Sequence, residues 1–194
     1  MLNVTLRRRQ GTGIKRAAGG LIRAASMVAV LFAVVGCGGN KTVNQELESS
    51  VDIDRFMGRW YVLGFTPTML DKTAVNATET YAMKENGKIQ TTYSFRKKTP
   101  NGKSKTYEPV GWVYDKESNS EWRMRFFGVY VAPYYILHVS EDYQHTVVGH
   151  PNRKLAWVMS RSPVVSDATY EELVGELRSR EYDLSTFKGM VQEW

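Results

Sequence analysis

The chain has 194 residues and a formal net charge of +6, with 26 lysine and arginine residues against 20 acidic ones. The first 36 residues carry six of the basic side chains and none of the acidic ones, so the rest of the chain balances 20 against 20. Net charge therefore argues against nucleic acid as a partner, because phosphate recognition needs a clustered basic surface.

Residues 1–36 have the composition of a secretory signal. Six basic residues precede the apolar run of residues 24–35. This run is too short for a membrane-spanning helix, whereas a basic segment followed by about a dozen apolar residues is typical of a signal peptide. We predict that residues 1–36 are a lipoprotein signal peptide, because a cysteine directly follows the apolar run.

The chain has a single cysteine, Cys37, which directly follows the apolar run in the sequence Val34-Val35-Gly36-Cys37. This pattern resembles the lipobox of bacterial lipoproteins, and the resemblance implies that Cys37 is the acylated first residue of the mature protein. In such lipoproteins, an aspartate directly after the cysteine favours retention in the inner membrane. Here Gly38 and Gly39 follow Cys37, so the resemblance implies that the protein is located at the periplasmic face of the outer membrane. The alternative is a buried thiol at the end of a plain signal anchor.

Residues 37–51 are rich in Gly, Asn, Gln, Glu and Ser and show no apolar periodicity, so we expect a flexible, lipidated tether. Residues 52–194 contain no low-complexity segment and no repeat of fixed period. One domain of this length is the simplest organisation.

Short β-rich runs recur through this domain, separated by segments such as 85–88, 100–102, 115–119 and 151–153 that favour turns. The expected strands are residues 58–65, 75–83, 89–95, 107–114, 121–127, 134–140, 145–149 and 155–161. Eight strands joined by short turns predict a mainly β fold, an eight-stranded antiparallel up-and-down β-barrel.

A helix follows the strands. Ser166 or Asp167 can cap it, and Tyr170, Leu173, Val174 and Leu177 share one face at helical spacing. Since the opposite face is charged, we expect this C-terminal amphipathic helix to pack outside the barrel. Residues 187–191 are expected to add a short edge strand.

Three short motifs resemble those of the lipocalin family. They are Gly58-Arg59-Trp60-Tyr61 at the first strand, Glu141-Asp142-Tyr143 before residues 145–149, and Arg161 after the last long strand. The second motif departs from the commoner Thr-Asp-Tyr at its first position. Within the family, the chain resembles the bacterial outer-membrane lipoproteins of the Blc type and apolipoprotein D. The resemblance implies that Arg161 packs over Trp60 at the closed end of the barrel.

Side-chain alternation predicts which residues face a ligand inside such a barrel. Trp122, Met124 and Phe126 share one face opposite two arginines, so we expect them inside. On the next strand we expect Tyr135 and Leu137 inside, because this places His138 outside. Tyr93 and Val113 are weaker candidates. The alternative is that these side chains complete a filled core without a ligand.

Enzyme chemistry finds little support in the sequence. The three histidines lack metal-binding spacing, and neither a nucleophilic serine motif nor a free cysteine is present in residues 52–194. We therefore expect a protein that is not an enzyme and needs no metal or cofactor. A homodimer is left open by the sequence.

The resemblance implies binding, storage or transport of a lipid-like ligand, such as a fatty acid or lysophospholipid, at the outer membrane. A role in membrane maintenance under stress accompanies this expectation. The alternative is a structural or stress-related envelope lipoprotein without a physiological ligand.

Overall fold

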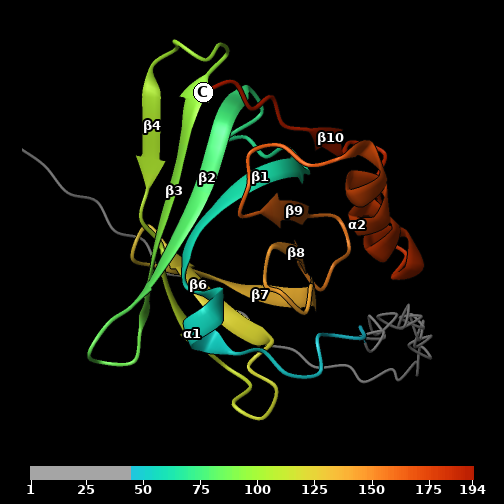
Figure 1. Cartoon of the computed structure of the whole chain (residues 1–194). Coiled ribbons are helices and arrows are strands. Elements are labelled where there is room, and N and C mark those ends of the chain that lie inside the picture. The colour runs from blue at the N-terminus through green and yellow to red at the C-terminus, as the bar shows by residue number, and fades with distance from the viewer. Residues whose placement is uncertain (1–44) are drawn as a thin grey trace, which may run out of the picture. The chain divides into compact units, whose positions relative to one another are not determined.

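The structure is a computed structural model that describes residues 45–194. Ten strands form one antiparallel sheet that curves into a barrel (Figure 1). The strands are β1 (Gly58–Phe65), β2 (Ala74–Met83), β3 (Ile89–Lys97), β4 (Ser104–Tyr107), β5 (Val110–Val113), β6 (Glu121–Phe126), β7 (Tyr130–Val139), β8 (His145–Gly149), β9 (Ala156–Ser160) and β10 (Lys188–Gly189).

Pairing between the first and the last long strand closes the barrel. β1 pairs with β2 on one side and with β9 on the other, where Tyr61 lies opposite Ser160. β4 and β5 both pair with β3 and act as two segments of one barrel strand, while β10 pairs with the end of β1. The predicted eight-stranded antiparallel up-and-down barrel is therefore confirmed, and so is the short edge strand.

Two strands differ from their predicted extents. The run expected over residues 107–114 is interrupted between β4 and β5, because Pro109 has no N–H to donate to a neighbouring strand. β7 begins at Tyr130, earlier than expected, so the apolar stretch that precedes Tyr134 belongs to a strand and not to a loop. This stretch pairs with β6 as far as Phe126.

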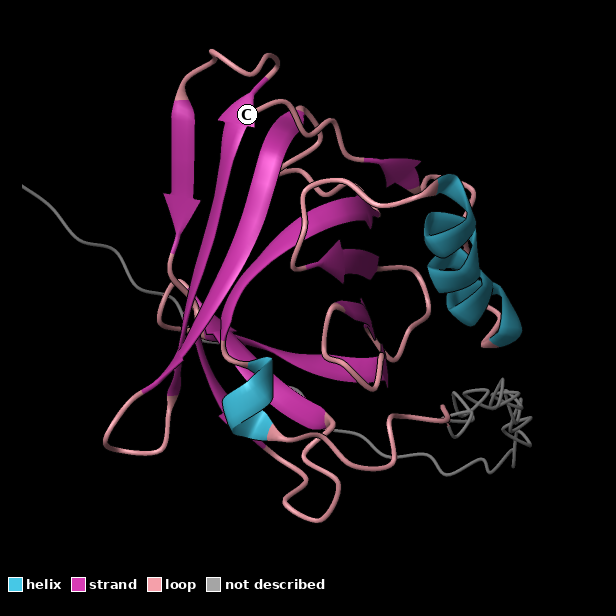
Figure 2. Cartoon of the chain, in the orientation of Figure 1, coloured by secondary structure: helices cyan, strands magenta, loops and turns pink. Residues whose placement is uncertain are grey.

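Within residues 45–194, two helices lie outside the sheet (Figure 2). The short α1 (Ile53–Phe56) covers the end of the barrel where β1 begins (Figure 1). The longer α2 (Asp167–Ser179) begins after Ser166, whose side chain accepts a hydrogen bond from the Thr169 backbone N–H. The face of α2 that carries Leu173, Val174 and Leu177 is buried against β8 and β9, as the helical spacing predicted.

Residues 45–51, which were expected to belong to the flexible tether, lie against the barrel. The Glu48 N–H donates to the Ile136 carbonyl at 3.0 Å, and the Glu48 carboxylate accepts from the Val139 N–H at the same distance. The Val51 N–H donates to the Ser118 carbonyl at 2.7 Å, and the Val51 side chain is buried. These residues are held against the barrel because β7 and the turn before β6 present backbone groups that they satisfy. Among residues 45–194, no helix is both long enough and apolar enough to cross a membrane.

Candidate functional site: an interior cavity above a sealed barrel end

The barrel end next to α1 is sealed by Trp60. Its side chain is completely buried, and its indole N–H donates to the Phe56 carbonyl at 2.9 Å. The guanidinium carbon of Arg161 lies 3.7 Å from the centre of the Trp60 ring, as the resemblance implied. A guanidinium stacked on an indole contributes about 0.5 to 2 kcal/mol. Gly58 has φ of +94°, and a Cβ atom at this position would meet the Arg161 guanidinium at 3.3 Å.

The same guanidinium binds the carbonyl groups at the C-terminus of α1. It donates to the carbonyls of Arg55, Met57 and Arg59 at 2.7 to 2.8 Å. Positive charge at this position satisfies carbonyl groups that a helix end leaves without partners. Arg161 therefore joins the end of β9 to α1 and to the beginning of β1.

The predicted Asp142 and Tyr143 lie in the turn between β7 and β8, at the same sealed end. The Asp142 carboxylate accepts from the Ser140 hydroxyl at 2.6 Å, and hydrogen bonds of this kind lower the pKa of Asp142. The Tyr143 hydroxyl accepts from the Asp52 N–H at 2.7 Å, while the Arg55 guanidinium lies over the Tyr143 ring. The turn thus holds α1 in place and does not face the cavity.

Above the sealed end, the barrel contains a cavity of about 450 Å³, within the usual range for ligand pockets. The side chain of Met69 lines the cavity and is 96 % exposed, so the cavity reaches the surface there. Phe127 and Tyr130 also line it and are exposed. Most of the lining is apolar or aromatic, contributed by Met69, Leu70, Tyr93, Tyr107, Pro109, Met124, Phe126, Phe127, Tyr130, Ala132, Pro133, Tyr134, Leu155 and Trp157.

Three of the predicted ligand-facing residues line this cavity: Tyr93, Met124 and Phe126. Trp122 faces the interior as expected, but it is completely buried among Phe56, Tyr81 and Tyr134. Val113 packs against the same cluster. The sealed half of the barrel is therefore a filled core, and the cavity occupies the other half.

The predicted orientation of β7 is wrong. Tyr134 lines the cavity, whereas Leu137 is buried on the outer face with Leu173 and Leu177 of α2. Tyr135 packs on the same outer face. Both faces of β7 are apolar because the cavity lies on one side and α2 on the other, so hydrophobicity did not distinguish them. Tyr135 and Leu137 are consequently removed from the ligand-facing set.

A chain of hydrogen bonds joins Glu79, Tyr81 and Tyr134 at the wall of the cavity. The Tyr81 hydroxyl donates to the Glu79 carboxylate, and the Tyr81 and Tyr134 hydroxyl oxygens are 2.5 Å apart. Each hydroxyl has one hydrogen, so Tyr134 is the donor to Tyr81 when Glu79 is ionised. Burial raises the pKa of Glu79 to about 7, with a further increase from the nearby Asp71.

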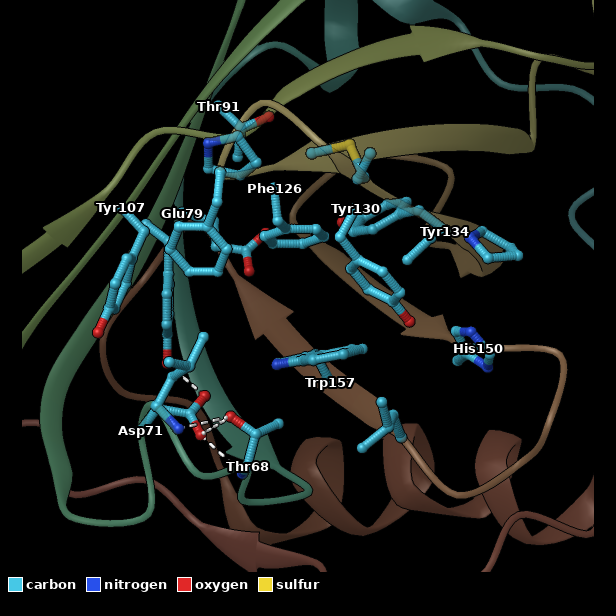
Figure 3. A pocket seen from close by; sticks show the side chains of 18 of the residues that line it. Thr68, Asp71, Glu79, Thr91, Tyr107, Phe126, Tyr130, Tyr134, His150 and Trp157 are labelled. Atoms are coloured by element: carbon cyan, nitrogen blue, oxygen red, sulfur yellow. Dashed lines mark hydrogen bonds between the residues drawn. The ribbon is translucent and has the colours of Figure 1, made fainter. Parts of the chain in front are cut away.

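A second carboxylate, that of Asp71, lines the same cavity but is fully engaged (Figure 3). One of its oxygens accepts from the Thr68 N–H at 2.7 Å and from the Thr68 hydroxyl at 2.8 Å. The other accepts from the Tyr93 hydroxyl at 3.0 Å, and burial raises the pKa of Tyr93. These bonds fasten the segment between β1 and β2 to β3.

The ionisable side chains that line the cavity are mainly acidic. Across residues 45–194, no lysine or arginine lines it, and His150 is the only basic side chain that does. Burial lowers the pKa of His150, and its Nδ1 atom accepts from the Asn152 N–H at 3.2 Å. In the part of the chain that the structure describes, no group of three or more potential ligands is placed to hold a metal ion.

Neither carboxylate was predicted as a site residue from the sequence. Glu79 lies two residues from Tyr81 in an expected strand, so it shares the face of a large aromatic residue. That spacing could have indicated that Glu79 faces the interior, but a charged side chain in a strand usually faces solvent. Asp71 lies outside every expected strand and carried no signal.

Together these features define a class of protein: a small β-barrel that is sealed at one end and holds a ligand-sized, largely apolar cavity at the other. The chain belongs to the lipocalin family, since the model of the Lipocalin-like domain matches residues 51–192. The predicted acylation site, Cys37, lies outside the described residues.

Several curated proteins are similar to this chain. A putative lipocalin of Acanthamoeba polyphaga mimivirus is 31 % identical, covering 71 % of this chain and 83 % of its own. Temperature-induced lipocalin-1 of Arabidopsis thaliana is 28 % identical, covering 72 % and 78 %. The outer membrane lipoprotein Blc of Escherichia coli K12 is 22 % identical over the same shares of the two chains.

Solved structures share the fold. Insecticyanin from the tobacco hornworm Manduca sexta superimposes with a TM-score of 0.58 at 20 % identity, covering 76 % of this chain and 84 % of its own. Lobster apocrustacyanin A1 gives the same TM-score at 13 % identity, covering 74 % and 81 %.

Proposed function

We propose that this protein binds a lipid-like hydrophobic molecule inside the barrel and stores or carries it at the outer membrane. The observation that carries the proposal is the cavity of about 450 Å³, lined mainly by apolar and aromatic side chains and open beside Met69. Proteins of the lipocalin family bind small hydrophobic ligands. A cavity of this size accommodates a single acyl chain, the part that a fatty acid and a lysophospholipid share.

The proposed activity is binding and not catalysis. Two of the polar groups at the cavity, Asp71 and Tyr93, are hydrogen-bonded to each other, and the Thr68 side chain also donates to Asp71. The apolar rim, where Met69 and Phe127 are exposed, suits the entry of a hydrophobic molecule better than that of a polar substrate.

Filling the cavity tests the proposal. Ala132 lines it on β7, whereas its neighbour Val131 is exposed. In a titration with the neutral fluorophore N-phenyl-1-naphthylamine, we expect Ala132→Phe to weaken saturable binding by about tenfold or more, because the new ring occupies ligand volume. The control Val131→Phe places the same ring at an exposed position of the same strand and should bind as the wild type does.

Absence of saturable binding to the delipidated wild-type protein would overturn the proposal. It would favour the alternative of a structural envelope lipoprotein without a physiological ligand. Equal binding by the wild type, Ala132→Phe and Val131→Phe would show that the fluorophore binds elsewhere.

Location at the outer membrane rests on the lipobox-like sequence around Cys37 and on the names of the Blc relatives. A role in membrane maintenance under stress belongs to the same proposal, supported by the name of the temperature-induced plant relative. Membrane attachment through acylated Cys37 is the part of the proposal that the single substitution Cys37→Ser tests.

A further inference from the structure

At the cavity wall around Glu79, the hydroxyl hydrogens of three tyrosines are already used in hydrogen bonds within the protein. The hydroxyl hydrogens of Tyr81 and Tyr134 are used in the chain that leads to Glu79. The hydroxyl hydrogen of Tyr93 is used by Asp71, whose two oxygens accept three hydrogen bonds in all. Apart from the Thr91 hydroxyl, the hydrogen-bonding capacity that remains near Glu79 is therefore that of oxygen lone pairs.

Two atoms at this point lack partners within residues 45–194. The Glu79 carboxylate accepts one bond, from Tyr81 to Oε2, and Oε1 receives none. Thr91, opposite Tyr81 on β3, is 2 % exposed and lines the cavity, yet its hydroxyl has no hydrogen-bond partner. A buried polar group without a partner costs about 1 to 3 kcal/mol, so a ligand that supplies one is stabilised.

We infer that the cavity selects an apolar ligand whose polar group is a hydrogen-bond donor, and specifically a protonated primary amine that binds at Glu79. An ammonium group offers three donors and no acceptor, which complements the lone pairs of Glu79, Tyr134 and Thr91. Its positive charge compensates for Glu79 and Asp71, which no lysine or arginine of residues 45–194 neutralises within the cavity.

A carboxylate head group is disfavoured by the same geometry. It offers acceptors only, and at Glu79 it would bring a second negative charge into a buried site. His150, the one basic side chain of the lining in residues 45–194, lies across the cavity from Glu79 (Figure 3). The inference rests on the proposed function and narrows its ligand class, because it favours amine-bearing amphiphiles over free fatty acids.

Three ligands with one chain length test the inference. Dodecylamine, dodecanoate and dodecanol displace N-phenyl-1-naphthylamine from the delipidated protein at pH 8, where Glu79 is ionised. We expect dodecylamine to bind at least about tenfold more tightly than dodecanoate, in line with the strength of a buried, charge-assisted hydrogen bond. The Glu79→Gln variant should bring this ratio to within about threefold of unity while retaining its affinity for dodecanol.

The control variant is Glu85→Gln, which removes the same charge from the exposed turn between β2 and β3 and should keep the wild-type ratio. Dodecanoate binding as tightly as dodecylamine, or a ratio unchanged in Glu79→Gln, would overturn the inference. If dodecanol also failed to displace the fluorophore from the wild type, the proposed function itself would be overturned.

A measurement on the wild type keeps the inference testable if Glu79→Gln does not fold. Between pH 8 and pH 5.5 dodecylamine stays cationic, while Glu79 gains a proton in a site that it shares with Asp71, Tyr81, Tyr93, Tyr134 and His150. The affinity for dodecylamine relative to dodecanol should fall by about fivefold or more. An unchanged ratio across this range would contradict an ammonium bound at Glu79.

Discussion

The side chain of Arg161 performs three tasks at one point: it covers the Trp60 ring, caps α1 and fixes the start of β1. All three concern the sealed end, and the cavity lies in the other half of the barrel. The lipocalin-like motifs of the sequence thus lie at the sealed end, and none of their residues lines the cavity in residues 45–194.

We expect Arg161→Ala to lower the free energy of unfolding by about 2 to 4 kcal/mol, because it leaves several carbonyl groups without donors and uncovers the indole. Denaturant unfolding measures the loss, and fluorophore titration measures the cavity. The control is Arg178→Ala, which removes a largely exposed ion pair with Glu171 and should cost less than about 1 kcal/mol. A larger effect on fluorophore affinity than on stability would contradict the structural role.

Glu79 should make stability depend on pH. Its pKa in the folded protein is about 7, against 4.5 as its ordinary value. Between these values the folded state holds a proton that the unfolded state has released, so the free energy of unfolding decreases as pH rises through this window. Below pH 4.5 the carboxyl group is neutral in both states, and above pH 7 it is ionised in both.

We therefore expect the wild type to gain about 2 to 3 kcal/mol relative to Glu79→Gln when the pH is lowered from 8 to 5. Denaturant melts at several pH values measure the difference. His150 titrates in both proteins, so its contribution cancels. Glu85→Gln should follow the wild type. Parallel curves for the wild type and Glu79→Gln would show that the pKa of Glu79 is not raised in the folded protein.

At the scale of elements, β7 shows how far the sequence predicted the fold. The strand positions and the eight-stranded barrel followed from turn residues and from the alternation of polar and apolar residues. The buried face of α2 followed from helical spacing, because one face of this helix is apolar and the other is charged. β7 has two apolar faces, since α2 covers Leu137 from outside while the cavity adjoins Tyr134. Only the tertiary structure decides which face lies inside.

The same limit applies to the site. Met124 and Phe126 alternate with Arg123 and Arg125, so their inward orientation could be predicted. The importance of Glu79 could not, because its raised pKa arises from burial and from Asp71 on a different segment of the chain. Contacts between distant segments leave no periodic trace in the sequence.

A substitution on the outer face of β7 tests the corrected orientation. We expect Leu137→Ala to lower the free energy of unfolding by about 2 to 5 kcal/mol, because it opens a space beneath α2. Fluorophore affinity should stay within about twofold of the wild type. A loss of affinity with little loss of stability would instead place Leu137 inside the barrel. Val131→Ala, at an exposed position of the same strand, is the control.

At the scale of the whole molecule, the contacts of residues 45–51 with the barrel leave only a short segment between the described structure and the predicted anchor, Cys37. Gln45 is buried, and its side chain accepts from the Tyr182 hydroxyl at 3.1 Å. Seven residues lie between Cys37 and Gln45. The eight residue-to-residue steps that join them span at most about 28 Å when extended. An anchored barrel would therefore remain within that distance of the membrane surface.

We expect Cys37→Ser to release the protein from the membrane fraction and to abolish the mass increase of acylation, because the chains that hold it in the bilayer are lost. Fractionation and intact-mass spectrometry after expression in a bacterial host measure both effects. Fluorophore binding by the released protein should match that of the delipidated wild type. Retention of Cys37→Ser in the membrane would contradict the lipid anchor.

The pairing of β1 with β9 has a consequence for how this protein folds. Tyr61 and Ser160 lie opposite each other although 98 residues separate them in the chain. Closing a loop of about 100 residues costs roughly 2 kcal/mol more entropy than closing one of about ten. Neighbouring hairpins have no such cost, so this seam is the slow pairing of the sheet. All-β barrels are expected to fold in milliseconds to seconds. The two sheet edges at β1 and β9, and the aromatic interior between them, stay accessible to other chains until this seam forms, which is when aggregation competes most strongly with folding.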